Sequence, residues 1–251
     1  MYNNKEQSCH FVLFFVIINL VITVEWSRLE LLLKNKLEIV QNKKILIIGL
    51  GGVGGYALES IARLGIKNLI IVDGDKVDIT NINRQIIALH STVGKAKIEV
   101  FKERVLDINP DCNIIAINKF LVKEDINEFI TEDIDYVIDA CDTVEVKKEI
   151  IRVCDKKKIK FITSMGTGNK LNPLKFEIID IRKTEYDPLA KVIRKMVRDE
   201  KITCKVPVVC SKESPIKNDS NIIASCSFVP SVAGLLCTSY IVNDIVGDIN
   251  E

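Results

Sequence analysis

The sequence contains no Cys-x-x-Cys pair, and its eight cysteines follow no regular spacing. Structural zinc sites commonly use such pairs, so we expect no zinc. A disulfide scaffold is not expected either. With 251 residues, 47% of them hydrophobic, the chain is long and apolar enough to build a core without disulfides. The cysteines are therefore predicted to be reduced, as in a cytoplasmic protein.

An excess of charge of one sign is also lacking, because 35 Lys and Arg residues against 34 Asp and Glu residues leave a net charge of +1. This balance excludes a histone-like polycation, although a local basic patch remains compatible with it. No internal repeat or low-complexity tract is present. The composition is that of a globular chain of one or two domains, and not of a disordered or fibrous one.

One long apolar run lies near the N-terminus, where residues 11–24 read FVLFFVIINLVITV. The uncharged stretch 8–24 is at the short limit for crossing a bilayer. It lacks the basic flank and small-residue cleavage site of a signal peptide. Three interpretations of residues 1–24 stay open: a membrane anchor, an extension upstream of the true start, or a segment covered by the protein or a partner. We expect a cytoplasmic location, with membrane contact through residues 8–24 as the alternative.

From residue 43 onward, short apolar runs alternate with amphipathic stretches. Strands are predicted over residues 44–49, 68–73, 112–117, 135–140 and 159–164. Helices are predicted between them, over residues 53–64, 94–108 and 144–154. Continuous apolar strands separated by helices indicate a mostly parallel sheet covered on both faces, which is a doubly wound, Rossmann-like α/β fold. Ligands are then expected at the carboxyl ends of the strands.

The pattern changes after residue 164. We predict a further strand over 176–181, a basic helix over 188–200, a long exposed loop over 202–224 and an apolar helix over 232–246. Residues 25–251 are therefore taken as one nucleotide-binding domain, in which residues 174–231 form a C-terminal substrate-binding extension.

A glycine-rich motif, GLGGVG at residues 49–54, follows the first predicted strand and opens the first helix. Gly49 permits a tight turn, Gly51 lets a phosphate approach the backbone, and Gly54 lets helix and strand pack closely, with Gly52 between them. The helix N-terminus then offers free N–H groups to an anion. Asp73 ends the next strand and is placed to accept ribose hydroxyls. Together these features predict a nucleotide site.

The segment after Asp73 argues against a dinucleotide. Residues 73–85 read DGDKVDITNINRQ, which brings charged and polar side chains to the site, including Asp75 and Asn81. A triphosphate carries about four negative charges and needs several cations, usually with magnesium. Arg84 and Lys97 would supply cations, and Asp142 would hold the metal. We therefore predict ATP and Mg²⁺ as cofactors.

Four motifs, GLGGVG, VDGDKVDITNINRQ, HSTVGKAK and IDACDT, resemble the adenylating superfamily of ThiF, MoeB, HesA and the ubiquitin-activating enzymes. The resemblance implies that Gly51 and Asp73 hold the nucleotide and that Asp142 binds magnesium. It implies contacts to the phosphates from Asn81, Arg84 and Lys97.

The same resemblance implies a homodimer. An upstream arginine of the family reaches the ATP of the partner subunit, and Arg28, in the tripeptide at 26–28, fits that place.

Three later motifs narrow the resemblance: SMGTGNKLNP at 164–173, DIRKTEYDPLAKVIRK at 180–195 and SFVPSVAGLL at 227–236. They resemble the tRNA threonylcarbamoyladenosine dehydratases over about residues 26–247. This implies that the threonyl carboxylate of N6-threonylcarbamoyladenosine in the tRNA anticodon loop is activated with ATP, and that ring closure then removes water. The alternative is an adenylyltransferase for a sulfur-carrier protein, of the ThiF or MoeB type, against which the missing cysteine pairs count.

A tRNA substrate needs a basic surface. Residues 182–205 contain eight basic and four acidic residues. Five of the basic residues share one predicted helical face: Lys191, Arg194, Lys195, Arg198 and Lys201. We predict that this face contacts tRNA phosphates, and a merely solvated helix face is the alternative. Cys204 and Cys210 lie where some relatives place a catalytic thiol, and the sequence assigns them no role.

Overall fold

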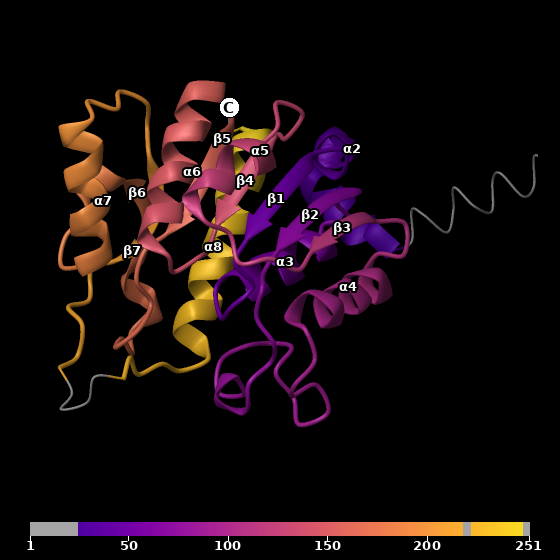
Figure 1. The fold of residues 1–251 in the computed structure, drawn as a ribbon. Helices are drawn as coiled ribbons and strands as arrows, with labels where there is room; N and C mark the ends of the chain where they lie inside the picture. The colour runs from indigo at the N-terminus through magenta and orange to yellow at the C-terminus, as the bar shows by residue number, and fades with distance from the viewer. Residues whose placement is uncertain (1–24, 218–221, 248–251) are drawn as a thin grey trace, which may run out of the picture.

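The computed structural model describes residues 25–217 and 222–247 (Figure 1). The apolar segment at residues 1–24, with its predicted membrane contact, lies outside the described residues. Residues 25–33 are helical, and the chain then enters the α/β body.

One twisted sheet forms the centre of the molecule, with the strand order β3-β2-β1-β4-β5-β7-β6. All neighbouring strands are parallel except β6 and β7, which are antiparallel. The strands are β1 Lys44–Ile48, β2 Asn68–Val72, β3 Asn113–Ile117, β4 Tyr136–Asp139, β5 Lys160–Ser164, β6 Phe176–Asp180 and β7 Pro207–Ser211. The predicted mostly parallel, Rossmann-like fold is confirmed.

Helices cover both faces of this sheet. They are α2 Leu37–Gln41, α3 Gly54–Arg63, α4 Lys97–Ile108, α5 Ile126–Phe129, α6 Val144–Lys157, α7 Pro188–Asp199 and α8 Phe228–Val246. Short 3-10 segments lie at Lys34–Lys36, Ile79–Asn81, Lys123–Asp125, Pro173–Lys175 and Ile181–Lys183. Successive side chains of a strand point to opposite faces. Accordingly Ile45 and Ile47 pack in the core with α3, α4 and α8, whereas Leu46 and Ile48 pack in the core with α5, α6 and α7.

The predicted exposed loop at 202–224 is wrong in its first half. Strand β7 is buried along its whole length and lies between β5 and β6. Its apolar run is short and is flanked by Lys205 and Lys212, so the sequence resembles a loop. Pro207 is tolerated because it is the first residue of the strand.

Two helices begin elsewhere than predicted. Helix α4 begins at Lys97 and not at Gly94, because Gly94 adopts a left-handed backbone with φ +87°. Helix α8 begins at Phe228, before the predicted residue 232, and packs closely on α3. A Cβ on Gly234 would lie 2.3 Å from the Val53 carbonyl oxygen, so glycine permits this approach. Among the described residues, α8 alone is long and apolar enough to cross a membrane, a property that core helices share.

Candidate active site at the carboxyl ends of the strands

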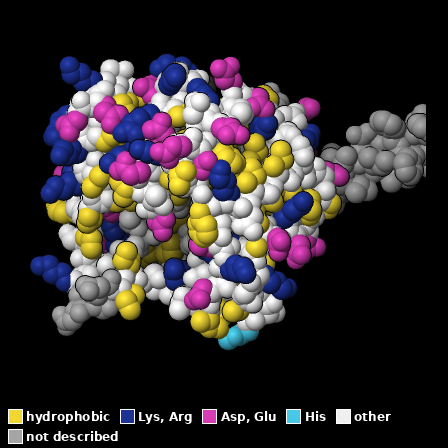
Figure 2. Space-filling view, in the orientation of Figure 1, with side chains coloured by type: hydrophobic (Ala, Val, Ile, Leu, Met, Phe, Trp, Pro, Cys, Tyr) yellow, Lys and Arg dark blue, Asp and Glu magenta, His cyan; other side chains and the backbone are white. Residues whose placement is uncertain are grey.

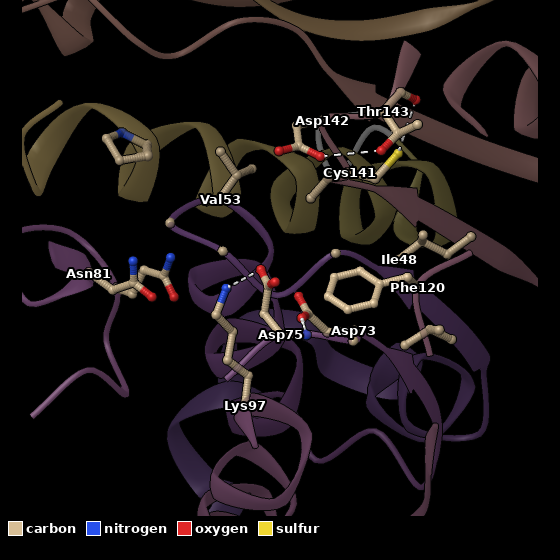
Figure 3. Close-up of a pocket in the computed structure, with 18 of the residues that line it drawn as sticks. Ile48, Val53, Asp73, Asp75, Asn81, Lys97, Phe120, Cys141, Asp142 and Thr143 are labelled. Atoms are coloured by element: carbon tan, nitrogen blue, oxygen red, sulfur yellow. Dashed lines mark hydrogen bonds and ion pairs between the residues drawn. The ribbon is translucent and has the colours of Figure 1, made fainter. Parts of the chain in front are cut away.

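A cavity of about 550 Å³ opens where β1, β2 and β4 end, as the fold predicts (Figure 3). Its lining includes Ile48 and Val72 from the strand ends. It also includes most of the predicted nucleotide-site residues: Gly49, Gly51, Gly52, Asp73, Asp75, Asn81, Arg84, Lys97 and Asp142. Segments up to about 90 residues apart in the sequence are therefore brought to one site.

The glycine turn lies against the end of β4. Gly49 has φ +86°, and a Cβ there would lie 2.8 Å from the carbonyl oxygen of Ala140. A Cβ on Gly54 would lie only 1.8 Å from the Gly49 carbonyl oxygen, so Gly54 packs beneath the turn and does not line the cavity. Gly51 is different, because the nearest atom to a Cβ there, Nε2 of Gln85, is 3.9 Å away. Gly51 thus leaves open space at the cavity wall.

Asp73 connects the glycine turn to the segment after β2. Its Oδ2 accepts a hydrogen bond from the Leu50 backbone N–H at 2.6 Å, and its Oδ1 accepts one from the Asp75 N–H at 2.8 Å. Each carboxylate oxygen has a second lone pair, so the group retains the capacity to accept a ligand hydroxyl.

Two cations are held at the cavity by internal bonds. The ammonium of Lys97, whose side chain is 5% exposed, lies 2.8 Å from Oδ2 of Asp75. This ion pair is drawn in Figure 3. Arg84 is half-buried, and its guanidinium donates to the carbonyl oxygen of Thr80 at 3.0 Å and to Oδ1 of Asn83 at 2.9 Å. The lysine ammonium and the guanidinium both keep further N–H donors for an anion.

Asn81 is buried, and its Oδ1 accepts a bond from the Asp78 backbone N–H at 3.2 Å. The Asp78 carboxylate in turn accepts a bond from the Thr80 N–H at 2.8 Å, so the two side chains cap the 3-10 segment Ile79–Asn81. This cap sets the conformation of the segment that leads to Arg84.

Asp142 lies across the cavity from Lys97, in the segment after β4 (Figure 3). Its side chain is exposed, and the Thr143 hydroxyl lies 3.5 Å from its Oδ1. Within residues 25–217 and 222–247, no three His, Cys, Asp or Glu side chains gather as a metal site. Mg²⁺ is commonly held by one or two carboxylates together with substrate phosphates. A single free carboxylate facing a phosphate-sized cavity fits that pattern.

The ThiF family model matches residues 27–245, which include every element of this site. The chain belongs to the ThiF family. A tRNA threonylcarbamoyladenosine dehydratase of Bacillus subtilis (strain 168) is 43% identical over 243 residues, which cover 90% of this chain and 96% of that protein. The solved structure of the E. coli tRNA N6-threonylcarbamoyladenosine dehydratase in complex with ATP matches with a TM-score of 0.84 and 31% identity, over 89% of this chain and 94% of that one.

A more distant relative in the family is a molybdopterin-synthase adenylyltransferase of Haemophilus influenzae. It is 35% identical over 126 residues, which cover 50% of this chain and 51% of that protein. The likeness to dehydratases therefore extends over nearly the whole chain, whereas the likeness to this adenylyltransferase covers about half.

Two further residues of this ThiF-family site were missed by the sequence analysis. Gln85 is buried and lines the cavity, and its Oε1 has no hydrogen-bond partner among the described residues. Its position directly after Arg84 in the NRQ motif was a usable signal. The ring of Phe120 also lines the cavity and closes over Gly74, where a Cβ would meet the ring at 2.6 Å. Nothing local in the sequence marks Phe120.

The thiols near the site are not activated. Burial raises the pKa of Cys204 to about 11 and that of Cys210 to about 12. Cys210 lies in the buried strand β7 and not in a polar loop as predicted. Cys141 lines the cavity, and burial, together with the charge of Asp139, raises its pKa well above the usual value. None of the three favours a thiolate near neutral pH.

The predicted tRNA-binding residues lie apart from the cavity, on and just after α7. Lys and Arg side chains gather at the left edge of Figure 2, where Figure 1 places α7. Lys191, Lys195 and Arg198 are exposed. Arg194 is half-buried and donates to the carbonyl and hydroxyl oxygens of Thr184. With Lys201, Arg194 and Arg198 line a second cleft of about 480 Å³.

Arg28 is exposed on the helical stretch 25–33 and does not line the nucleotide cavity of its own chain. The single chain therefore does not bring it to the other predicted site residues.

Proposed function

We propose that this protein is an ATP-dependent tRNA threonylcarbamoyladenosine dehydratase. The observation that carries the proposal is the joint one of site and family. A cavity at a glycine turn gathers Arg84, Lys97 and Asp142, in a chain that matches such dehydratases over nearly its full length. The E. coli relative binds ATP, and the same nucleotide fits the anion-binding character of this cavity.

The proposed chemistry begins with a poor leaving group. A carboxylate oxygen cannot leave readily, so the threonyl carboxylate is first joined to a phosphate of ATP as a mixed anhydride. A nitrogen or oxygen of the same modification then attacks the activated carbonyl, the ring closes and water is formally lost. The attacking atom is already tethered close to its target, so proximity supplies much of the rate.

This chain's own residues have defined parts in the proposal. The backbone N–H groups after Gly51 bind a phosphate at the start of α3. Arg84 and Lys97 bind further phosphate oxygens, and Asp73 and Asn81 hold the nucleotide beside them. Asp142 would hold Mg²⁺, which when bound neutralises charge on the phosphates.

Further parts of the proposal concern partners and location. We propose that Lys191, Lys195 and Arg198 contact tRNA phosphates, supported by their exposure on one face of α7. We also propose a cytoplasmic homodimer in which Arg28 reaches the partner's nucleotide, supported by its exposed position outside the cavity.

The decisive experiment is mass spectrometry of nucleosides after incubating the purified protein with ATP, Mg²⁺ and tRNA that carries threonylcarbamoyladenosine. The expected result is a nucleoside lighter by one water. Persistence of the linear nucleoside, with protein that still binds ATP, would reject the proposal. A parallel incubation with a sulfur-carrier protein tests the alternative, for which an acyl-adenylate would form on that protein instead.

A further inference from the structure

A fully buried pair of opposite charges lies behind the cavity. Lys147 of α6 and Asp139 at the end of β4 have side chains that are 0% exposed, and Nζ lies 2.7 Å from Oδ2. The Lys147 ammonium also donates to the Thr163 hydroxyl on β5 at 3.0 Å, and that hydroxyl donates to the same carboxylate oxygen. The proposed chemistry uses none of these three groups.

The other oxygen of Asp139 faces the nucleotide site. Its Oδ1 accepts a hydrogen bond from the backbone N–H of Cys141 at 3.2 Å, and the Cys141 thiol lies 3.0 Å from the same oxygen. Residues 140–143, here called the 140–143 loop, carry Asp142 along the cavity wall. One carboxylate therefore joins a buried cation to the backbone that presents Asp142.

Stability alone is a weak reason for such a pair. Desolvating two charges costs several kcal/mol per ion, and replacing a buried pair with apolar residues is often neutral or stabilising. Desolvation lowers the pKa of Lys147, but the charge of Asp139 more than offsets this, so the pKa is raised and the ammonium stays protonated. What the charged pair adds is a defined orientation of the Asp139 carboxylate.

We propose that Lys147 is a positioning residue, which through Asp139 holds the 140–143 loop so that Asp142 faces the glycine turn. Thr163 completes the arrangement by bonding to both charged groups. This inference rests on the proposed function, in which Asp142 holds the Mg²⁺ that binds with ATP.

The test is calorimetric binding of a non-hydrolysable ATP analogue over a range of Mg²⁺ concentrations. Lys147→Met should raise the Mg²⁺ concentration needed for half-maximal effect by at least about tenfold, because Asp139 loses the cation that orients it. Binding of the analogue without Mg²⁺ should stay close to wild type. The double variant Asp139→Asn/Lys147→Met should return to within about threefold of wild type, because its amide can still accept from the Cys141 N–H without a cation.

A matched control is Lys170→Met. Lys170 pairs with Asp187 at 3.2 Å, and both side chains are 1% exposed, but neither contacts the 140–143 loop. This variant should lower the melting temperature without changing the Mg²⁺ requirement. An unchanged requirement in Lys147→Met, or an equal rise in Lys170→Met, would overturn the inference.

If Lys147→Met does not fold, Thr163→Val decides, because it keeps the ion pair and removes only the bridging hydroxyl. A rise of about threefold in the Mg²⁺ requirement is expected, and no rise overturns the inference. Failure of the proposed function is separate, since it would appear as wild-type protein that makes no cyclised nucleoside whatever its Mg²⁺ requirement.

Discussion

Gly51 and Gly54 lie three residues apart in one motif, yet alanine at the two positions should fail for different reasons. At Gly54 a Cβ would lie 1.8 Å from the Gly49 carbonyl oxygen and 3.1 Å from the Ala140 Cβ. Backbone cannot move aside as a flexible side chain can, so the cost falls at the upper end of the usual overpacking range, about 3 kcal/mol or more. For a domain of this size that lowers the melting temperature by roughly 6–12 °C.

At Gly51 no described atom lies nearer than 3.9 Å to the added methyl group, so the fold should keep its stability within about 0.5 kcal/mol. The methyl group instead occupies space at the cavity wall where a phosphate would approach the backbone. Loss of one charge-assisted hydrogen bond costs about 1.5–3 kcal/mol, which is roughly a 10- to 100-fold weaker ATP affinity. Thermal melting and calorimetric ATP binding measure the two effects on the same samples. The reasoning fails if Gly51→Ala melts as low as Gly54→Ala, or if Gly51→Ala binds ATP like the wild type.

Other predictions follow from the site and its surroundings. Asp142→Asn should abolish turnover without lowering the melting temperature, because this side chain is exposed; full turnover at saturating Mg²⁺ would contradict the metal assignment. Mixing Arg28→Ala with Asp142→Ala protein should restore part of the activity, since one site of a mixed dimer keeps both groups. Cys204 and Cys210 should resist alkylation at pH 8, where pKa values of about 11 and 12 leave roughly a thousandth or less as thiolate, and labelling should rise only as the pH approaches those values. Reversing three exposed charges of α7 to glutamate should weaken tRNA binding and lower the log–log salt slope by roughly 0.7–0.9 per lost contact: Lys191, Lys195 and Arg198.

Each of these has its own check. Absence of recovery despite proven subunit exchange would count against the role of Arg28 in trans. Rapid labelling of either thiol at pH 8, read by peptide mass spectrometry, would show that its environment is misjudged. For α7, the control reverses three exposed charges elsewhere, and equal salt slopes for both triple variants would mean that α7 is only solvated: Lys67, Lys102 and Lys123.

Local signals in the sequence were enough for the parallel strands and the glycine turn. Strand β1 is a run of β-branched and other apolar residues that stops at a glycine, and its pattern has one interpretation. Strand β7 has the same burial but only a short apolar run after Pro207, between two lysines. Its place in the sheet depends on pairing with β5 and β6, which are distant partners that periodicity does not reveal.

The site shows the same division. Gly51 and Asp142 belong to motifs that are contiguous in sequence, so they could be named as candidates before their geometry was known. Lys147 reads in the sequence as one more lysine of an amphipathic helix, although its side chain is 0% exposed. Only the packing of α6 against β4 and β5 reveals that it faces a carboxylate and a hydroxyl in the interior.

The position of β7 has a consequence for synthesis on the ribosome. Strand β6 leaves the exit tunnel before β7, but β6 bonds to the sheet only through β7. Until residue 211 has emerged, β5 therefore presents an unpaired edge, and the segment of β6 has no neighbour in the sheet. Such edges are open to pairing with other chains. A nascent or truncated chain that stops within α7 should consequently depend on a chaperone for its solubility, whereas release of about a dozen further residues would close the edge.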